Sequence, residues 1–395
     1  MTTLHSGVVL TPEERLARRR LIVHDALSLL TLFLITAVIF ALTWLLHRSF
    51  EDHREELGRR WKTRGEQALA AGHPQSAIEA LRSALAYVPD RGTEIELATA
   101  LADAGKTTEA MAYFSTLWDS APGDGTINVQ LARLAARQGN EATAVLHYQE
   151  ALDGTWQGNG YDRRREVRLE LANYLLSRGK SDQARTQLLI AAGNAPDDPA
   201  IKIQIAGMME KAGDLDGALG IYRTLSTRHG APVAALSGAG RTSFELGMYR
   251  AAADYLSRTL AQADAETLPE AERDADRGMF ATADRIQLLF PAYDLPARLR
   301  AERILSLRNT AHARLAACSA APATAAALGD LVDRWNQLPA RLTVSGLEQD
   351  PDLEQTIFQL VCDTETVTAS ACGQPSGDDA LILRIAKNPG AVEQP

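Results

Sequence analysis

The sequence predicts an all-α protein in which an N-terminal transmembrane helix precedes an α-solenoid of helix-turn-helix repeats and a helical C-terminal cap. Six glycines recur at intervals of 33, 34, 40, 34 and 34 residues, which is the period of a two-helix repeat. An uncharged run before them is long enough to cross a bilayer as a helix. Beyond them the period fades, but segments with helical apolar faces continue. The six are Gly72, Gly105, Gly139, Gly179, Gly213 and Gly247.

Each repeat has three further positions of fixed size. Seven residues before the glycine stands glycine or alanine, five residues after it stands alanine, and nine residues after it stands a large apolar residue. Small residues let two helix backbones approach closely, and the large residue follows the alanine by one turn on the same face. We therefore expect the three positions to meet at the seam between two helices. In the first repeat they are Gly65, Ala77 and Leu81.

This pattern resembles the tetratricopeptide repeat family. The resemblance covers roughly residues 61–262, and it implies helix pairs stacked into a right-handed superhelix whose concave face holds a partner protein or peptide, without catalysis. The later repeats match less closely, because the tryptophan of the first repeat is replaced in all of them. The residues that carry the match in the first repeat are Trp61, Gly65, Gly72, Ala77, Leu81, Ala84 and Pro89.

Residues 1–25 form an N-terminal tail, and residues 26–46 are the predicted transmembrane helix. The only polar side chains in this span are serine and threonine hydroxyls. No small-x-small cleavage site follows the run, so we interpret it as a retained anchor rather than a signal peptide, with a buried core helix as the alternative. Residues 47–60 lack proline and alternate in charge, which predicts a solvated helical stem.

The orientation of this span is not decided by the number of basic residues, since arginines flank it on both sides. Long domains cross the membrane largely regardless of charge, whereas a tail with three consecutive arginines is a poor candidate for export. Basic residues that are mostly arginine, together with abundant alanine, are common in bacteria with GC-rich genomes. We therefore expect a single-pass protein of the cytoplasmic membrane with its repeats in the periplasm.

Residues 263–395 are predicted to be a helical capping extension, because a solenoid needs atypical ends to cover its last apolar face. An independent small domain is the alternative. This region holds the three cysteines, Cys318, Cys362 and Cys372. In an oxidising compartment Cys362 and Cys372 could close a small loop, with Cys318 unpaired or exchanging with one of them. In a reducing compartment all three would stay thiols.

Two features suggest where a partner binds. The interval of 40 residues marks an insertion, and insertions in solenoids form surface loops. This loop, residues 154–161, carries aromatic residues and is followed by arginines, the residue types that dominate interface hot spots. The alternative is a solvated tip whose tryptophan folds back onto its own repeat. The predicted docking residues are Trp156, Tyr161, Arg163, Arg164 and Arg165.

The second feature is a row of aliphatic residues on the first helices of four consecutive repeats, Ile95, Val129, Leu169 and Ile203. In the family this position tends to face the inner groove, where such a row would accept the apolar face of a partner helix. The alternative is that these residues replace the missing tryptophan in the core. Polar residues expected on the inner face are Thr99, Arg133, Arg137, Asn173 and Arg241.

Composition and motifs argue against several functions. A formal net charge of −9 with scattered arginine does not give the basic face of a nucleic-acid binder. The chain has no glycine-rich phosphate loop and none of the common hydrolase or metalloprotease signatures, so we expect neither catalysis nor a cofactor or metal. The leading hypothesis is a membrane-anchored scaffold for envelope assembly or biogenesis. Alternatives are a constitutive subunit of a membrane complex and a polymer-handling component of a secretion system.

Overall fold

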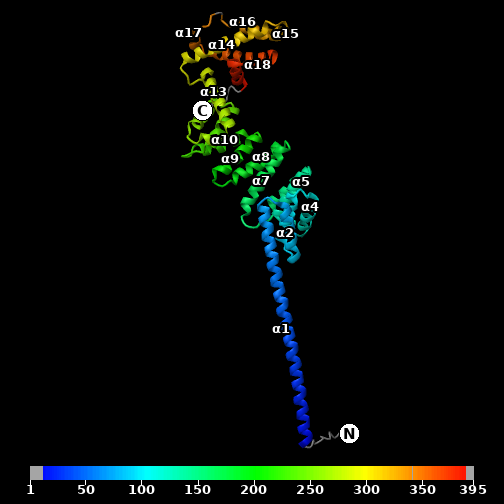
Figure 1. Ribbon diagram of the computed structural model, residues 1–395. Helices are drawn as coiled ribbons and strands as arrows, with labels where there is room; N and C mark the ends of the chain where they lie inside the picture. The colour runs from blue at the N-terminus through cyan, green and yellow to red at the C-terminus, as the bar shows by residue number, and fades with distance from the viewer. Residues whose placement is uncertain (1–11, 340, 388–395) are drawn as a thin grey trace, which may run out of the picture. The chain divides into compact units, whose positions relative to one another are not determined.

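The computed structural model describes residues 12–339 and 341–387, and within these ranges every regular element is a helix (Figure 1). The all-α class predicted from the sequence is confirmed. The chain divides into two compact units, Met1–Gly158 and Asn159–Pro395, and each is described by itself.

The first unit consists of three helix pairs, the first of which is completed by the C-terminal end of a long N-terminal helix. α1 pairs with α2, α3 with α4, and α5 with α6. Successive pairs also pack on each other through α2 and α3 and through α4 and α5, as in a solenoid. The bounds are α1 (Pro12–Ala70), α2 (Pro74–Tyr87), α3 (Arg91–Asp103), α4 (Thr107–Ser120), α5 (Gly125–Arg137) and α6 (Glu141–Asp153).

The second unit continues with three more pairs and then with helices outside the repeat period. The pairs are α7 (Gly160–Ser177) with α8 (Ser181–Gly193), α9 (Pro199–Lys211) with α10 (Leu215–Ser226), and α11 (Val233–Glu245) with α12 (Tyr249–Ala261). The 3-10 turn η1 (Ala265–Thr267) and α13 (Glu270–Leu289) follow. The remaining elements are α14 (Ala297–Ser319), α15 (Pro322–Ala325), η2 (Ala326–Leu328), α16 (Gly329–Asn336), α17 (Val344–Glu348), α18 (Pro351–Cys372) and α19 (Gly377–Lys387).

The recurrent glycines end the first helix of every pair. All six have φ between 71° and 79°, the left-handed region in which glycine has no steric penalty. At Gly105 the following Lys106 amide donates to the Leu101 carbonyl (2.9 Å), and the Gly105 amide donates to Ala102 (3.2 Å). This pair of bonds satisfies carbonyls that the helix end would otherwise leave open. The glycine period is therefore a period of turns.

The three fixed-size positions meet at the seam of each pair, as expected. The recurrent alanines are fully buried, and the large apolar residues of the second helices are at most 2% exposed. At Gly65 an added Cβ would lie 2.6 Å from Leu81 Cγ, and at Gly240 it would lie 2.6 Å from Leu256 Cγ. The two helices of these pairs are thus closer than any larger residue would permit.

α1 is one continuous helix that contains the apolar run, the stem and the first helix of the first repeat. Its most apolar 18-residue window has a mean hydropathy of 2.6 and no buried residue. Figure 1 shows this part extending well beyond the helices that pack on the other end of α1. The packed part begins near Arg54, whose Nη2 donates to the Tyr87 carbonyl (2.7 Å), and includes Gly58, which is buried against Val88.

The helices after the sixth pair have two cores. α13 packs on α11 and α12, and its Ile286 joins Phe244 and Tyr249 in an apolar cluster. α14, α16, α17 and α18 surround a separate cluster that includes Ile304 and Ile357. α19 contributes to both, with Ile382 in the second cluster and Ile385 in the first. The last helix thus joins the end of the repeats to the C-terminal helices.

The expected pairing of Cys362 with Cys372 is wrong. The disulfide joins Cys318 on α14 to Cys372 at the end of α18, with their Cα atoms 6.0 Å apart, and Cys362 is a buried free thiol. The reason is that residues 362–372 form no loop but the last turns of α18. Ten helical residues separate two Cα atoms by about 15 Å, roughly twice what a disulfide can span.

Candidate protein-binding groove

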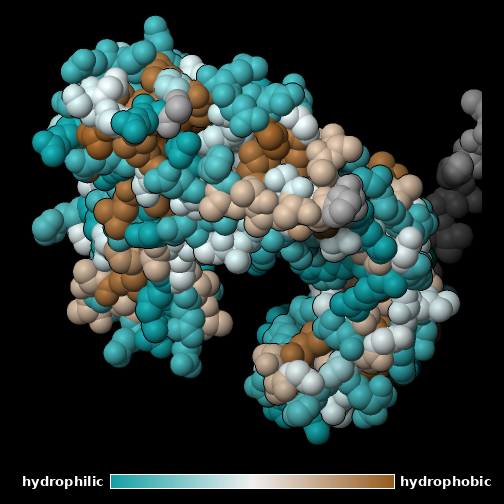
Figure 2. Space-filling model, turned by 90° about the horizontal axis from the view of Figure 1, so that it is seen from above, coloured by the Kyte–Doolittle hydropathy of each residue, from teal (hydrophilic) through white to brown (hydrophobic). Residues whose placement is uncertain are grey.

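Apolar surface outside α1 is sparse. Few large apolar side chains beyond α1 are exposed, and on the face drawn in Figure 2 apolar residues form separated patches among hydrophilic ones. A partner protein therefore has few places where it could bury apolar surface. A wide hollow with a volume of about 1030 Å³ lies in the second unit. We call it the unit-2 groove.

The unit-2 groove is lined by the first helices of three successive pairs, α7, α9 and α11, and is closed at one end by the connection after η1 and the start of α13. Tyr222 of α10 is the one lining residue in the described part of the chain that comes from a second helix. Leu169 of α7 and Ile203 of α9, two members of the predicted aliphatic row, lie in its lining, as do Ile201 and Met208. The groove therefore has an apolar component on adjacent repeats.

Amide side chains lie beside this apolar surface. Asn173 of α7 and Gln204 of α9 line the groove and are exposed. Within the described part of the chain neither amide makes a hydrogen bond. A primary amide both donates and accepts, as a peptide backbone does. Asn173 and Gln204 are therefore suited to hold the main chain of a bound segment whatever its sequence.

Fixed charges occupy the end of the groove near α13. Glu210 of α9 accepts hydrogen bonds from the Tyr222 hydroxyl (3.3 Å) and from Thr242, and Arg241 of α11 donates to Glu272 of α13 (2.8 Å). Burial raises the pKa of Tyr222, and nearby Glu210 raises it further, so the hydroxyl stays a donor. Burial alone would lower the pKa of Arg241, but its acidic neighbours raise it. These groups hold one another in place.

The contact between α11 and α13 contains a buried carboxyl group. Asp276 of α13 has no exposed surface and accepts a hydrogen bond from the Ser237 hydroxyl of α11 (2.6 Å). Burial raises the pKa of Asp276, although Ser237 and Arg241 lower it. α13 is therefore attached to the sixth pair by polar contacts as well as by Ile286. This attachment positions the wall of the groove that the repeats themselves do not supply.

The other predicted inner-face residues lie in the first unit and are engaged in its packing. Ile95 packs against the core of this unit, and Val129 is buried. Arg137 Nη1 donates to the Ala102 carbonyl (2.8 Å) at the end of α3, and Arg133 is half-buried one turn earlier on α5. The predicted row is thus divided. Leu169 and Ile203 line the unit-2 groove, whereas Ile95 and Val129 contribute to packing.

The tryptophan of the predicted docking loop is half-buried. Trp156 folds back onto the first unit, where its ring covers Gly125 and its Nε1 donates to the Ala151 carbonyl (2.9 Å). A Cβ on Gly125 would lie only 2.2 Å from the ring, so the glycine makes room for it. Tyr161, by contrast, is 86% exposed.

The arginines after the loop are paired along their own helix. Arg163 contacts Glu166 (3.2 Å), and Arg165 contacts Asp162 (2.7 Å). Arg164 is half-buried and also engaged with neighbouring groups. Acidic residues in the first turns of α7 thus offset the unfavourable interaction of these arginines with the helix dipole. No external acidic partner is required.

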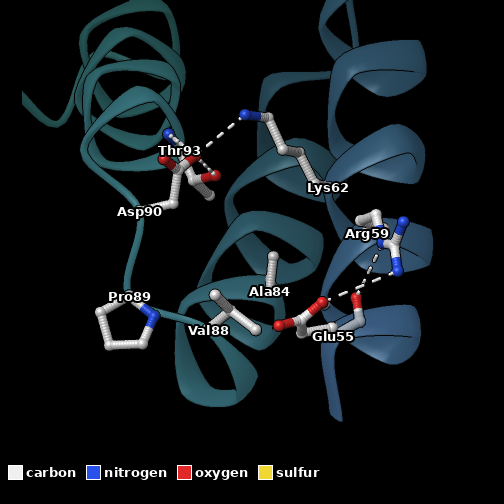
Figure 3. Close-up of a pocket in the computed structure, with 9 residues that line it drawn as sticks. Glu55, Arg59, Lys62, Ala84, Val88, Pro89, Asp90 and Thr93 are labelled. Atoms are coloured by element: carbon white, nitrogen blue, oxygen red, sulfur yellow. Dashed lines mark hydrogen bonds and ion pairs between the residues drawn. The ribbon is translucent and has the colours of Figure 1, made fainter. Parts of the chain in front are cut away.

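A smaller cavity of about 400 Å³ lies in the first repeat, between α1, α2 and α3 (Figure 3). Lys62 of α1 reaches across it to Asp90 (2.9 Å), and Asp90 also caps α3 through the Thr93 amide (3.0 Å). Hydrogen bonds from Thr93 and Lys62 lower the pKa of Asp90 to about 2. The Lys62–Asp90 ion pair therefore links the first helix pair to α3 of the second pair.

Sequence reasoning missed several groove residues. Gln204 and Met208 follow Ile203 by one residue and by five residues on α9, and helical periodicity could have placed at least one of them on the inner face. Leu268 lies in the connection between η1 and α13, and Glu272 lies in α13, and neither segment carries a repeat signal. Only the packing of α13 on α11 brings these two residues to the groove.

Comparisons with known proteins find a family model and several solved structures that are similar to parts of this chain. Residues 95–159 and 169–228 match the family model of the tetratricopeptide repeat. Among solved structures, PilF of Pseudomonas aeruginosa is 18% identical, with 57% of this chain and 99% of that chain covered and a TM-score of 0.40. PilW, described as a widely conserved type IV pilus biogenesis factor, is 17% identical, with 55% and 97% covered and a TM-score of 0.39.

A third similar structure is a thermophilic tetratricopeptide repeat protein of Thermus thermophilus. It is 22% identical, with 42% of this chain and 89% of that chain covered and a TM-score of 0.31. A search of curated protein sequences finds no match. The family match covers helices from both units, and these helices have the glycine turns and the small-residue seams described above. The helices within residues 95–159 and 169–228 therefore match tetratricopeptide repeats.

Proposed function

We propose that this protein is a non-enzymatic, membrane-anchored scaffold that binds a segment of a partner protein in the unit-2 groove and acts in bacterial envelope assembly or biogenesis. Tetratricopeptide repeats are protein-interaction repeats, and the groove is where this chain combines accessible apolar, amide and charged groups. The observation that carries the proposal is the position of Ile203 beside the unpaired amide of Gln204 on one groove-lining helix.

The chemistry of the groove supports a peptide segment as its ligand. Leu169, Ile203 and Met208 offer apolar contact, whereas Asn173 and Gln204 offer hydrogen bonds to a main chain. The charged groups near α13 are fixed in position by their mutual hydrogen bonds, so a bound segment does not have to order them. A volume of about 1030 Å³ holds a short segment rather than a whole helix pair.

Membrane anchoring is supported by the exposed apolar length of α1. Side chains such as Leu34 and Phe40 are 53% and 73% exposed, and no helix of the first unit covers them. In water this surface would be strongly unfavourable, whereas a bilayer accepts a helix of about 20 apolar residues. We therefore assign residues 26–46 to a single membrane span and place the repeats close to the bilayer.

The compartment of the repeats is supported by the cysteine arrangement. The Cys318–Cys372 disulfide lies on the same side of the span as the repeats, and disulfides persist in oxidising compartments such as the bacterial periplasm. The three consecutive arginines of the N-terminal segment are consistent with a cytoplasmic N-terminus. We propose that the groove faces the periplasm and that its partners are envelope proteins.

Quantitative affinity capture tests this function. Full-length protein in detergent is used as bait against envelope extracts, with the native chain, Ile203→Arg and Leu189→Arg compared. Leu189 is 53% exposed on α8 and does not line the groove, so it controls for an added surface charge. We expect Ile203→Arg to reduce capture of the specific partner at least tenfold, and Leu189→Arg to leave it unchanged. Equal capture by all three baits would refute a role for the groove.

A further inference from the structure

The C-terminal helix α19 is attached to the rest of the second unit through an unusual carboxyl pair. Glu365, in the middle of α18, has no exposed surface, and Asp379 of α19 lies close enough to share a hydrogen bond with it. Neither oxygen of Glu365 accepts a hydrogen bond from a donor group in the described ranges, and the same is true of Asp379 Oδ1. Two carboxylates that face each other without donors repel unless a proton lies between them.

The nearby arginine does not remove this repulsion. Arg314 of α14 lies 3.3 Å from Glu365 Oε2, but its Nε donates to the Thr368 hydroxyl (2.8 Å) and its Nη2 to the Gly373 carbonyl (2.8 Å). Two of its three nitrogens therefore donate to other groups. The charged groups that face Glu365 are Arg314 from α14 and Asp379 from α19. On α18 the adjacent Cys362 thiol is neutral, because burial raises its pKa to about 12.

A second buried glutamate of α18 accepts a direct hydrogen bond from an arginine through one of its two oxygens. Glu354, also on α18, accepts a hydrogen bond from Arg300 Nε of α14 at 2.7 Å. The two sites share the same pair of helices, an arginine from α14 and a buried glutamate from α18. They differ in that only Glu365 faces a carboxyl group of α19. Glu354 is therefore the matched control for Glu365.

We propose that α19 is a pH-responsive latch, in which a proton shared between Glu365 and Asp379 holds α19 on α14 and α18. Loss of this proton to solvent at alkaline pH leaves two facing carboxylates and loosens α19. The helix covers apolar surface at the end of the repeats, since Ile385 packs with Phe244, Tyr249 and Ile286. Loosening of α19 therefore uncovers the end of the repeat array.

The direction of the pH effect follows from the environment of Glu365. Burial raises its pKa from 4.5 to about 8, and Asp379 raises it while Arg314 lowers it. A carboxyl group whose pKa is higher when α19 is docked than when it is undocked stabilises the docked state. This stabilisation is complete at a pH below the pKa of the undocked state. That contribution is lost as the pH rises from about 4.5 through about 8. The latch is therefore closed in acid and weakest in alkali.

Other contacts of α19 do not explain such a response. Arg285 of α13 binds Asp378 through two hydrogen bonds (3.2 and 2.7 Å), and the Arg384 guanidinium lies 4.8 Å from the centre of the Phe244 ring. An arginine side chain stays charged in proteins. These two arginine contacts also attach α19 to the second unit. The shared proton therefore changes how firmly α19 is attached, and α19 does not depend on it for folding.

Hydrogen exchange of the full-length protein in detergent tests the latch. Exchange of residues 377–387 is followed by mass spectrometry at pH 6 to pH 9 and corrected for the intrinsic pH dependence of amide exchange. We expect the opening of α19 in the native chain to increase on the order of tenfold or more over this range. Glu365→Gln, whose amide donates permanently to Asp379, should remove this increase, and Glu354→Gln should retain it.

Asp379→Asn supplies a second, independent variant. It removes the facing carboxylate and should flatten the pH profile as Glu365→Gln does, even if one of the two variants folds poorly. A native chain whose α19 opening does not change with pH would overturn the proposal. The same conclusion would follow if Glu365→Gln and Asp379→Asn both kept the native pH profile.

Discussion

The seam between paired helices provides the sharpest test of how this sequence specifies its fold. Gly240 of α11 is buried, and a Cβ added there would lie 2.6 Å from Leu256 Cγ, 2.7 Å from Leu256 Cδ2 and 3.3 Å from the Leu256 backbone nitrogen. Gly220 of α10 is also inside a helix, but a Cβ there would meet no atom within 4 Å. The two glycines therefore separate the effect of crowding from that of helix propensity.

Alanine at either position raises helix propensity by about 1 kcal/mol. At Gly240 it also overpacks a seam in which Leu256 is fully buried, which typically costs about 1–3 kcal/mol. The propensity contribution cancels when the two variants are compared. We therefore expect Gly240→Ala to be less stable than Gly220→Ala by about 1–3 kcal/mol, a factor of roughly 5 to 150 in the equilibrium constant for opening.

Native-state hydrogen exchange of α10 to α12 measures this difference directly, because slowly exchanging amides report the free energy of opening. Gly220→Ala should slow their exchange slightly relative to the native chain, and Gly240→Ala should exchange faster than Gly220→Ala by the factor given above. If the two variants protect these amides equally, the seam has room for a larger residue. The steric explanation of the small-residue period would then be wrong.

Three further predictions concern the loop, the cysteines and the first repeat. Trp156→Ala should lower the stability of the first unit by on the order of 2 kcal/mol in thermal unfolding, because the ring covers Gly125, whereas Tyr161→Ala should change it by less than about 0.5 kcal/mol. Cys362 should resist alkylation at about pH 8.5 until the protein is denatured, since burial raises its thiol pKa to about 12, and mass spectrometry should then count one labelled thiol. Asp90→Ala should remove the N-cap of α3 at a cost of about 1 kcal/mol at pH 7. That cost, measured by hydrogen exchange, should shrink in acid, because the stabilisation by ionised Asp90 is complete above pH 3.8 and is lost as the pH falls through about 2.

The sequence predicted the repeats well because their structure depends on local requirements. A left-handed turn needs glycine at Gly72 and its equivalents, and a close seam needs a small residue facing a large one. Both requirements recur at a fixed spacing, so they are visible without knowledge of the fold. The exposed apolar run of α1 is equally local, because its length and lack of charge alone indicate a span.

The features that the sequence did not reveal depend on contacts between distant residues. Cys318 and Cys372 are 54 residues apart, and only the packing of α14 on α18 brings them together. The inward turn of Trp156 was left open as an alternative, because the space for its ring is made by Gly125, far earlier in the chain. Glu272 reaches the groove only through α13, which has no repeat signal. Pairings of this kind require the three-dimensional arrangement.

Site-specific photo-crosslinking in intact cells tests the central claim most directly. A photoreactive amino acid is placed at Gln204, which lines the unit-2 groove, and in a parallel variant at Leu189, which is also exposed but lies on α8 outside it. If the groove holds a segment of a partner protein, illumination should give a discrete crosslinked protein from Gln204 and not from Leu189. The same adducts from both positions, or none from Gln204, would contradict the account.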